Sequence, residues 1–307
     1  MINRILIRIK VLQIVYSFYQ NGNKDLKGAE TELLFSLQKS YDLYYYFLLL
    51  IVELTYQQKR NLEIRKNKYF PTFEELHPNT RLINNRFAAQ IEKNSQLQKY
   101  ITEQGISWSN DQDFIKNTLD TLLASELYTD YLKSPDTYES DKEFWKEAFK
   151  ILICNNEAVD DYLEDKSIYW NDDIAIVESF VLKTIKKIEE KDGKETILLP
   201  MFKDMEDKQY AITLLRQTLL KGTDYRAHIE KHLKNWESER VANMDLLIMQ
   251  VALAEILSFP SIPISVTLNE FIDISKYYST PKSAIFINGI LDSVIKELKS
   301  EKRLLKN

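Results

Sequence analysis

The chain is poor in glycine and proline, with 6 and 7 of these residues among 307. Turn-rich β-sheet proteins need more of both, so the composition favours long helices. The six glycines stand far apart, and neither the G-x-G-x-x-G loop of dinucleotide-binding proteins nor a Walker loop can form. These shortages exclude two glycine-rich nucleotide-binding loops and predict an all-α fold.

Cysteine and long apolar runs are also scarce. The one cysteine, Cys154, cannot form a disulfide within the chain, which fits a reducing compartment. The longest apolar run, residues 43–52, is too short to cross a bilayer. Arg4, Arg8 and Lys10 interrupt the N-terminal apolar stretch, and no signal-peptide cleavage pattern follows. We therefore expect a cytoplasmic protein without membrane association.

The titratable residues show no spacing that predicts catalysis or a metal centre. His228 and His232 have the i, i+4 spacing that a metal can use, but H-x-E-x-H differs from the zinc-protease motif H-E-x-x-H. Carboxylates are abundant but scattered, and no pair stands out as a general acid and base. We expect no enzymatic activity, no cofactor and no bound metal.

Charge is distributed unevenly along a chain whose net charge is −5. Residues 1–24 hold four basic residues and no acid, and residues 296–307 hold five basic residues against two acids. Residues 136–178 hold thirteen acids against four lysines. The basic ends suit an RNA backbone or are simply solvated. The acidic middle suits a basic partner or is likewise solvated.

Apolar periodicity predicts helices throughout the chain. The residues between about 60 and 82 mix basic and aromatic side chains; a solvated connector is favoured there over a nucleic-acid contact. The helix at 243–258 is apolar on nearly all sides, which predicts a central place in a bundle. The expected helices cover about 3–20, 25–59, 83–105, 110–133, 141–154, 156–166, 171–191, 205–221, 223–235 and 243–258, and two more follow in the last fifty residues.

Two C-terminal segments, IPISVTLNEF at 262–271 and SAIFINGILD at 283–292, carry the most specific motifs of the chain. They resemble the NusB family of bacterial antitermination factors. Residues 262–271 read IPISVTLNEF, where the family has V-P-x-x-V-A-I-N-E-A. Residues 283–292 read SAIFINGILD, where the family has S-x-K-F-V-N-G-V-L-D. Residues 244–257 look like the family helix of the form L-R-x-A-x-x-E-L. Gly289 lies inside an expected helix, where glycine usually indicates close packing or a contact with bare backbone.

The N-terminal segment resembles the same family more loosely. Arg4, Arg8 and the sequence LQIVY at 12–16 look like its arginine-rich opening and A-L-Q-A-L-Y core. Ile285 stands where the family often has lysine, and nearby Lys282 is a possible substitute. Residues 23–204 far exceed the family's short segment, so we expect an enlarged N-terminal helical region at 1–204 and a NusB-like C-terminal bundle at 205–307.

The resemblance implies an all-α fold of helical bundles and a function without catalysis. A NusB-like protein would bind boxA-type single-stranded RNA together with the ribosomal protein NusE, and would act on RNA polymerase during transcription of ribosomal RNA. It also implies that Glu255 faces the protein partner, and we expect a monomer. Arginine and lysine bind phosphate, and aromatic rings stack on bases. The RNA-binding candidates are Arg4, Arg8, Lys10, Tyr16, Lys282, Phe286 and Asn288.

Two other functions remain for comparison. An RNA methyltransferase with a NusB-like domain would need an α/β cofactor domain, which the glycine positions exclude. A helical protein-interaction scaffold that has lost RNA binding stays open. Salt-dependent RNA binding would separate that scaffold from an RNA-binding factor.

Overall fold

A computed structural model describes residues 1–22, 24–154, 156–233 and 241–304. Over these ranges the regular elements are all helical, apart from an isolated bridge between Ile2 and Phe202. The prediction of an all-α fold is therefore confirmed. No helix among the described residues is long and apolar enough to span a membrane.

The chain folds as two compact units. The central unit comprises Met1 and Gln38–Met201, and the terminal unit comprises Ile2–Leu37 and Phe202–Asn307. The long helix α2 (Leu26–Lys66) begins in the terminal unit and continues into the central one. The expected single boundary at 204/205 thus differs from the structure, in which the first helix folds with the C-terminal helices.

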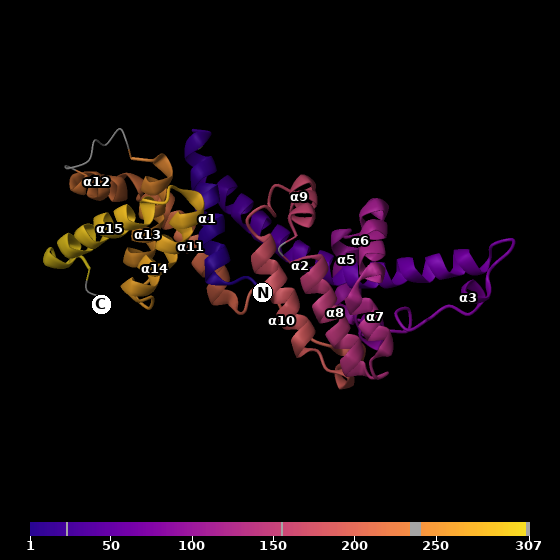
Figure 1. Ribbon diagram of the computed structural model, residues 1–307. Coiled ribbons are helices and arrows are strands. Elements are labelled where there is room, and N and C mark those ends of the chain that lie inside the picture. The colour runs from indigo at the N-terminus through magenta and orange to yellow at the C-terminus, as the bar shows by residue number, and fades with distance from the viewer. Residues whose placement is uncertain (23, 155, 234–240, 305–307) are drawn as a thin grey trace. The chain divides into compact units, whose positions relative to one another are not determined.

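The terminal unit is built around α13. This helix is buried on all sides and contacts α1, α11, α12, α14 and α15, as expected from its apolar sequence (Figure 1). Burial of so many side chains is the main stabilising contribution to this unit. Its helices are α1 (Arg4–Gln20), the start of α2, α11 (Met205–Leu220), α12 (Gly222–His232), α13 (Asn243–Ser258), α14 (Ile264–Tyr278) and α15 (Ser283–Ser300).

Helix α1 begins at a side-chain cap and is enclosed over most of its length. The Asn3 Oδ1 atom accepts a hydrogen bond from the Leu6 amide at 2.9 Å, which satisfies one of the open N–H groups of the first turn. All residues from Leu6 to Leu12 are buried. Helix α1 packs against α11 and α13, and its basic residues Arg8 and Lys10 are both buried.

The central unit packs shorter helices around the middle of α2. The aromatic cluster of α2 is buried: Tyr44, Tyr45, Tyr46 and Phe47 are each at most 5% exposed. These rings fill helix–helix contacts, as the sequence predicts. The remaining elements are α3 (Phe73–Leu76), α4 (Arg86–Glu92), α5 (Ser95–Gln104), α6 (Gln112–Ala124), α7 (Glu126–Lys133), α8 (Tyr138–Leu152), α9 (Glu157–Lys166), α10 (Ile174–Lys187) and the 3-10 helix η1 (Glu190–Glu195).

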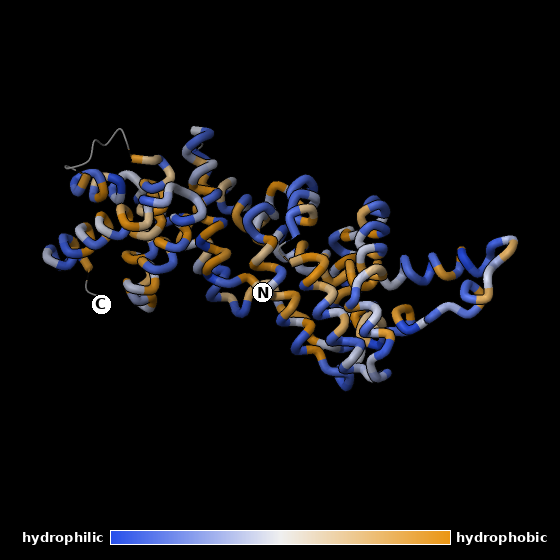
Figure 2. Tube along the Cα trace, in the orientation of Figure 1, coloured by the Kyte–Doolittle hydropathy of each residue, from blue (hydrophilic) through white to orange (hydrophobic). Residues whose placement is uncertain are grey.

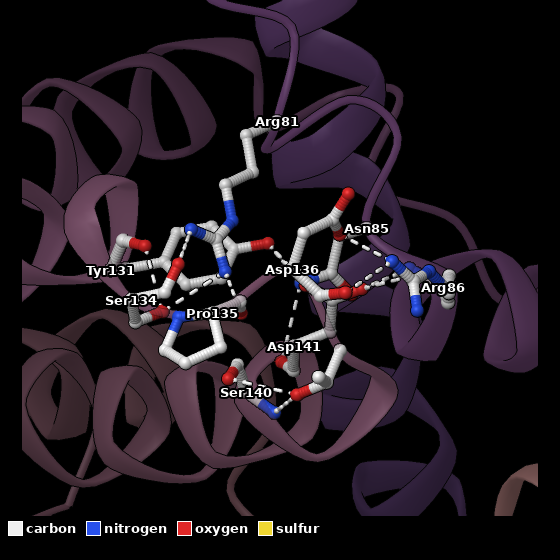
Figure 3. A network of polar contacts seen from close by, with 10 residues as sticks. Arg81, Asn85, Arg86, Tyr131, Ser134, Pro135, Asp136, Ser140 and Asp141 are labelled. Atoms are coloured by element: carbon white, nitrogen blue, oxygen red, sulfur yellow. Dashed lines mark hydrogen bonds and ion pairs between the residues drawn. The ribbon is translucent and has the colours of Figure 1, made fainter.

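One part of the central unit projects from its bundle. Helix α2 continues to Lys66, beyond its expected end, and the chain returns through α3 (Figure 1). The returning segment is fixed to the α7–α8 turn by a polar network (Figure 3). Arg81 donates to the backbone oxygens of Ser134 and Pro135, and its guanidinium lies 4.3 Å from the centre of the Tyr131 ring.

Candidate functional site

Arg8 lies in a buried ion-pair cluster in the terminal unit. Its guanidinium donates to both carboxylate oxygens of Glu255, with Nε–Oε2 at 2.8 Å and Nη2–Oε1 at 3.0 Å. A third bond joins Nη1 to Glu270 at 3.1 Å. The Arg8 side chain is 3% exposed and that of Glu255 is 0% exposed. This bidentate geometry connects α1 to α13 and α14.

The Glu255 carboxylate is fully satisfied in its buried site. Thr267 Oγ1 donates to it at 2.7 Å, and the Tyr210 hydroxyl donates as well. Burial alone would raise the pKa of Glu255, but the hydrogen bonds and charge of Arg8, with Thr267 and Tyr210, outweigh burial and hold that pKa below its ordinary value. Burial and the adjacent carboxylate raise the pKa of Tyr210. Glu255 is therefore an anion held by the protein itself.

Three expectations for this region need correction. Arg8 cannot offer its guanidinium to RNA phosphate, because Glu255 and Glu270 occupy its donors in the core. Lys10 is only 1% exposed and is likewise enclosed. Glu255, expected to face a protein partner, pairs within the chain and has no exposed surface.

Arg4 and Tyr16 lie closer to solvent on α1. The Arg4 side chain is 35% exposed and forms ion pairs with Glu206 at 3.0 Å and Asp207 at 3.4 Å. The pair with Glu206 is exposed and contributes about 0–1 kcal/mol, so a phosphate can displace it, whereas the pair with Asp207 is partly buried. Tyr16 is 40% exposed. These two side chains stay candidates for an RNA contact.

A second surface lies at the α14–α15 turn, and we call it the α14–α15 surface: Tyr277, Lys282, Ile285 and Asn288. Tyr277 is 87% exposed and Ile285 is 83% exposed. Lys282 and Asn288 are exposed as well. Lys282 is the N-cap residue of α15 and has helical backbone angles, and Ile285 and Asn288 follow it at intervals of three, so the three residues lie along one side of the helix start. Phe286 is half-buried beside them.

Asp245 of α13 fixes the turn that presents this surface. Its carboxylate accepts hydrogen bonds from the hydroxyls of Ser279 and Ser283, the latter at 2.9 Å. The Thr280 amide also donates to Ser283 Oγ at 3.2 Å. Asp245 and Ser283 are buried. These bonds tie both ends of the turn to the central helix and hold Lys282 at the surface.

Gly289 is exposed on α15, and a Cβ atom added there would meet no heavy atom within 4 Å among the described residues. Close packing within the chain therefore does not explain this glycine. A helix-interior glycine costs roughly 1 kcal/mol relative to alanine. The sequence suggests two reasons for a glycine here, close packing and a contact with bare backbone. Contact of another molecule with the bare backbone is the one that remains.

The two histidines with metal-like spacing lie elsewhere in the terminal unit. His232 Nε2 is 2.8 Å from Glu297 Oε2, and Lys231 also pairs with Glu297. His228 lies 3.9 Å from the same carboxylate. Over the described ranges, no group of three or more histidine, cysteine or acidic side chains is arranged to hold a metal ion.

The family model and the named relatives that match this chain all indicate the same family. The NusB family model matches residues 176–296. A transcription antitermination protein NusB from Salinibacter ruber is 35% identical over 132 residues, which cover 41% of this chain and 82% of that protein. The chain belongs to the NusB family. The Koribacter versatilis NusB is 39% identical over 103 residues, covering 33% of this chain and 70% of its own length.

A solved structure of NusB from T. maritima also matches part of the chain. It shares 28% sequence identity and covers 41% of this chain and 80% of its own, with a TM-score of 0.30. The NusB family model begins at residue 176, within α10 of the central unit. The family match thus extends upstream of 205, where the C-terminal resemblance was expected to start.

The structure brings Arg8 and Glu255 together, and it places Lys282 and Asn288 along one side of α15. Sequence reasoning missed Asp245 and Tyr277. The role of Asp245 depends on the turn 34 and 38 residues downstream folding back onto α13, and no local pattern reveals that approach. Tyr277 carries one available signal, since it follows a stripe of polar residues that recur every three or four positions along one helical face: Ser265, Asn269, Asp273 and Lys276.

Proposed function

We propose that this protein is a non-catalytic transcription antitermination factor that binds boxA-type single-stranded RNA together with the ribosomal protein NusE. In this role it would act on RNA polymerase during transcription of ribosomal RNA. Family membership supports antitermination, because the named relatives are transcription antitermination proteins. The proposed RNA contact is the α14–α15 surface.

The observation that carries this proposal is the composition of that surface. Lys282 offers a cation to phosphate, and Asn288 offers an amide that can both donate and accept hydrogen bonds with a base edge. Tyr277 offers an exposed ring on which a base can stack. Gly289 lets a ligand approach the helix backbone closely.

Lys282 is also well placed to substitute for the family lysine absent at Ile285. The two residues are separated by three positions at the first turn of α15, so their side chains are neighbours on the helix surface. Both are exposed. Arg4 and Tyr16 on α1 are secondary candidates, and Phe286 is a weaker one because it is half-buried.

A protein-only scaffold is the second candidate function. It is favoured by the burial of Arg8 and Lys10, which removes two cations from the surface of α1. It is also favoured by the exposure of Ile285 and Tyr277, which could pack against a protein partner. NusE binding without RNA binding is the behaviour that this alternative predicts.

The test compares RNA binding by charge-reversal variants on one helix. Lys282→Glu should weaken binding of a boxA RNA in the presence of NusE by about tenfold, because a charge-assisted bond is replaced by repulsion. Lys299→Glu is the matched control: Lys299 is also exposed on α15, in its last turn. This control should change the affinity by less than about threefold.

Salt titration adds a second readout. Loss of one phosphate contact should reduce the slope of log affinity against log salt by roughly 0.7 for single-stranded RNA. Equal affinities for the wild type and Lys282→Glu would contradict the proposed surface. NusE binding with no RNA affinity in the wild type would establish the scaffold function instead.

A further inference from the structure

The projecting end of α2 and the adjoining α3 expose an unusual group of aromatic side chains. We call residues 64–73 the arm tip. Tyr69 is 91% exposed, Phe70 is 84% exposed and Phe73 is 77% exposed. Figure 2 shows hydrophobic colour at the end of this otherwise hydrophilic projection. Large apolar side chains clustered in this way usually mark a binding surface.

The arm tip is also cationic. Residues 64–73 include Arg65, Lys66 and Lys68 and no acidic residue, and the acids Glu63, Glu74 and Glu75 border them. All three basic side chains are exposed. Elsewhere in the same unit, residues 136–178 carry thirteen acids against four lysines. The acidic segment repels a polyanion, whereas the exposed Arg65 and Lys66 at the tip can bind one.

Local bonds order the tip although its rings are exposed. Tyr69 and Phe70 pack edge to face, with ring centres 4.6 Å apart and planes at 87°. Thr72 and Glu75 form a reciprocal capping box at the start of α3, and Lys68 pairs with Glu75. The rings are therefore displayed from a defined backbone, which lowers the entropy cost of binding.

The base of the projection is anchored as well. The side-chain amide of Asn85 donates to the Tyr131 hydroxyl at 3.0 Å, and the backbone N–H of Arg86 donates to Asp141 Oδ2 at 2.9 Å (Figure 3). Tyr131 in turn donates to Asp141 Oδ1 at 2.7 Å. Together with the bonds of Arg81, these bonds fix the returning chain to α7 and α8. The base of the projection is therefore held in place by packed helices.

We propose that the arm tip is an additional binding site for single-stranded RNA, independent of the α14–α15 surface. Exposed rings stack on unpaired bases without requiring a particular sequence, while Arg65 and Lys66 contact the phosphates. Duplex RNA keeps its bases stacked inside the helix and offers no faces to these rings. The site therefore selects single strands over duplexes.

Two other occupants would use the same side chains differently. An anionic lipid surface or an acidic protein would need the apolar volume and the charge, but not the aromatic π-face. The three exposed rings together with Arg65 and Lys66 favour RNA, because ring stacking and phosphate pairing are then both used. Replacing the rings by leucine keeps the apolar volume and removes the π-face. This replacement should weaken RNA binding but not binding to a lipid surface or an acidic protein.

The experiment uses the full chain and three probes: a 20-nucleotide polyuridine, a 20-base-pair RNA duplex, and phosphatidylserine–phosphatidylcholine vesicles. The first variant replaces Tyr69, Phe70 and Phe73 by alanine, and the second replaces the same residues by leucine. A control variant replaces Ile151, Ile168 and Ile197 by alanine. These isoleucines belong to the same unit and are 60%, 80% and 74% exposed.

The wild type should bind polyuridine more tightly than the duplex. Both ring variants should lose polyuridine affinity by at least about tenfold, while the isoleucine control should not. Arg65→Gln with Lys66→Gln should reduce the salt slope by about 1.4, since two phosphate contacts are removed. Circular dichroism of each variant should show an unchanged helix content, because the replaced rings are exposed.

Several results would overturn the proposal: no polyuridine binding by the wild type, equal binding by the wild type and the ring variants, or full binding by the leucine variant. Vesicle binding that depends on the rings, with RNA affinity unaffected, would assign the tip to lipid. The boxA and NusE assay reports separately on the proposed function. Lys282→Glu should leave tip binding of polyuridine intact, and the ring variants should still form the complex with NusE.

Discussion

Replacement of Arg8 distinguishes a structural arginine from an RNA-binding one. Arg8→Ala would leave the Glu255 carboxylate, 0% exposed, without its bidentate partner. Removing one partner of a buried ion pair typically costs about 3–5 kcal/mol, because the remaining charge is desolvated and uncompensated. We expect a loss of this size in the stability of the terminal unit.

A double variant tests the origin of that loss. Arg8→Met with Glu255→Gln removes both charges, and the glutamine carbonyl can still accept hydrogen bonds from Thr267 and Tyr210. Buried ion pairs are often replaced by neutral side chains at little cost. The double variant should therefore be more stable than Arg8→Ala by at least about 1–2 kcal/mol.

Low pH should weaken the same ion pair between Arg8 and Glu255. The folded-state pKa of Glu255 lies below its ordinary value of 4.5, so the stability from this shift is fully present above about pH 4.5. It is lost as the pH falls through the folded-state pKa, where the carboxylate takes up a proton. The Arg8→Met/Glu255→Gln variant should lack this part of the acid destabilisation.

Amide hydrogen exchange of α1 and α13 is the suitable assay, because it reports on the terminal unit alone in a chain with two units. RNA affinity is measured in parallel on the folded protein. The double variant should bind boxA RNA within about threefold of the wild type. Unchanged exchange in Arg8→Ala, or a tenfold loss of RNA affinity in a stable double variant, would refute a structural role for Arg8.

Two further variants test other sites. Gly289→Ala should stabilise α15 by about 0.5–1 kcal/mol, which slower amide exchange would show, and should weaken RNA binding. Slower exchange with unchanged RNA affinity would exclude an RNA contact with the backbone at this glycine. Burial and the nearby charge of Asp160 raise the pKa of Glu178 to about 7, against a hydrogen bond from Cys154. Stability of the central unit should therefore fall by about 3 kcal/mol between pH 4.5 and 7. Glu178→Gln should raise its melting temperature at pH 8 but not at pH 5, and equal shifts at both values would contradict this linkage.

The sequence predicts the terminal bundle well, because its signals are local. The apolar helix at 243–258 and the two helices after Pro263 follow from periodicity, and the structure places them at Asn243–Ser258, Ile264–Tyr278 and Ser283–Ser300. The shortage of glycine and proline correctly indicated a helical protein.

Helix breaks in the central unit were harder to predict, because distant contacts fix them. Residues 83–105 were expected to form one helix, but the chain turns at Asn94. Its Oδ1 atom caps α5 by accepting from the Leu97 amide at 2.9 Å, and its Nδ2 atom donates to the Thr196 carbonyl at 2.7 Å. The second bond joins residues 102 positions apart, which periodicity cannot reveal.

The candidate site was predictable only in part for the same reason. Whether a basic residue is buried or exposed depends on the residues that tertiary packing brings next to it. Arg8 meets Glu255, 247 residues away, and becomes part of the core. Lys282 follows a turn fixed by Asp245 and remains exposed. Charge patterns alone treat these two cations alike.

Photochemical cross-linking of a boxA RNA carrying 4-thiouridine to the complex with NusE tests the central claim most directly. The claim is that the α14–α15 surface, not the enclosed cations of α1, contacts the transcript. We predict cross-linked peptides containing Tyr277, Lys282 or Asn288. Cross-links confined to peptides around Arg8 and Lys10, with none at 277–288, would contradict it.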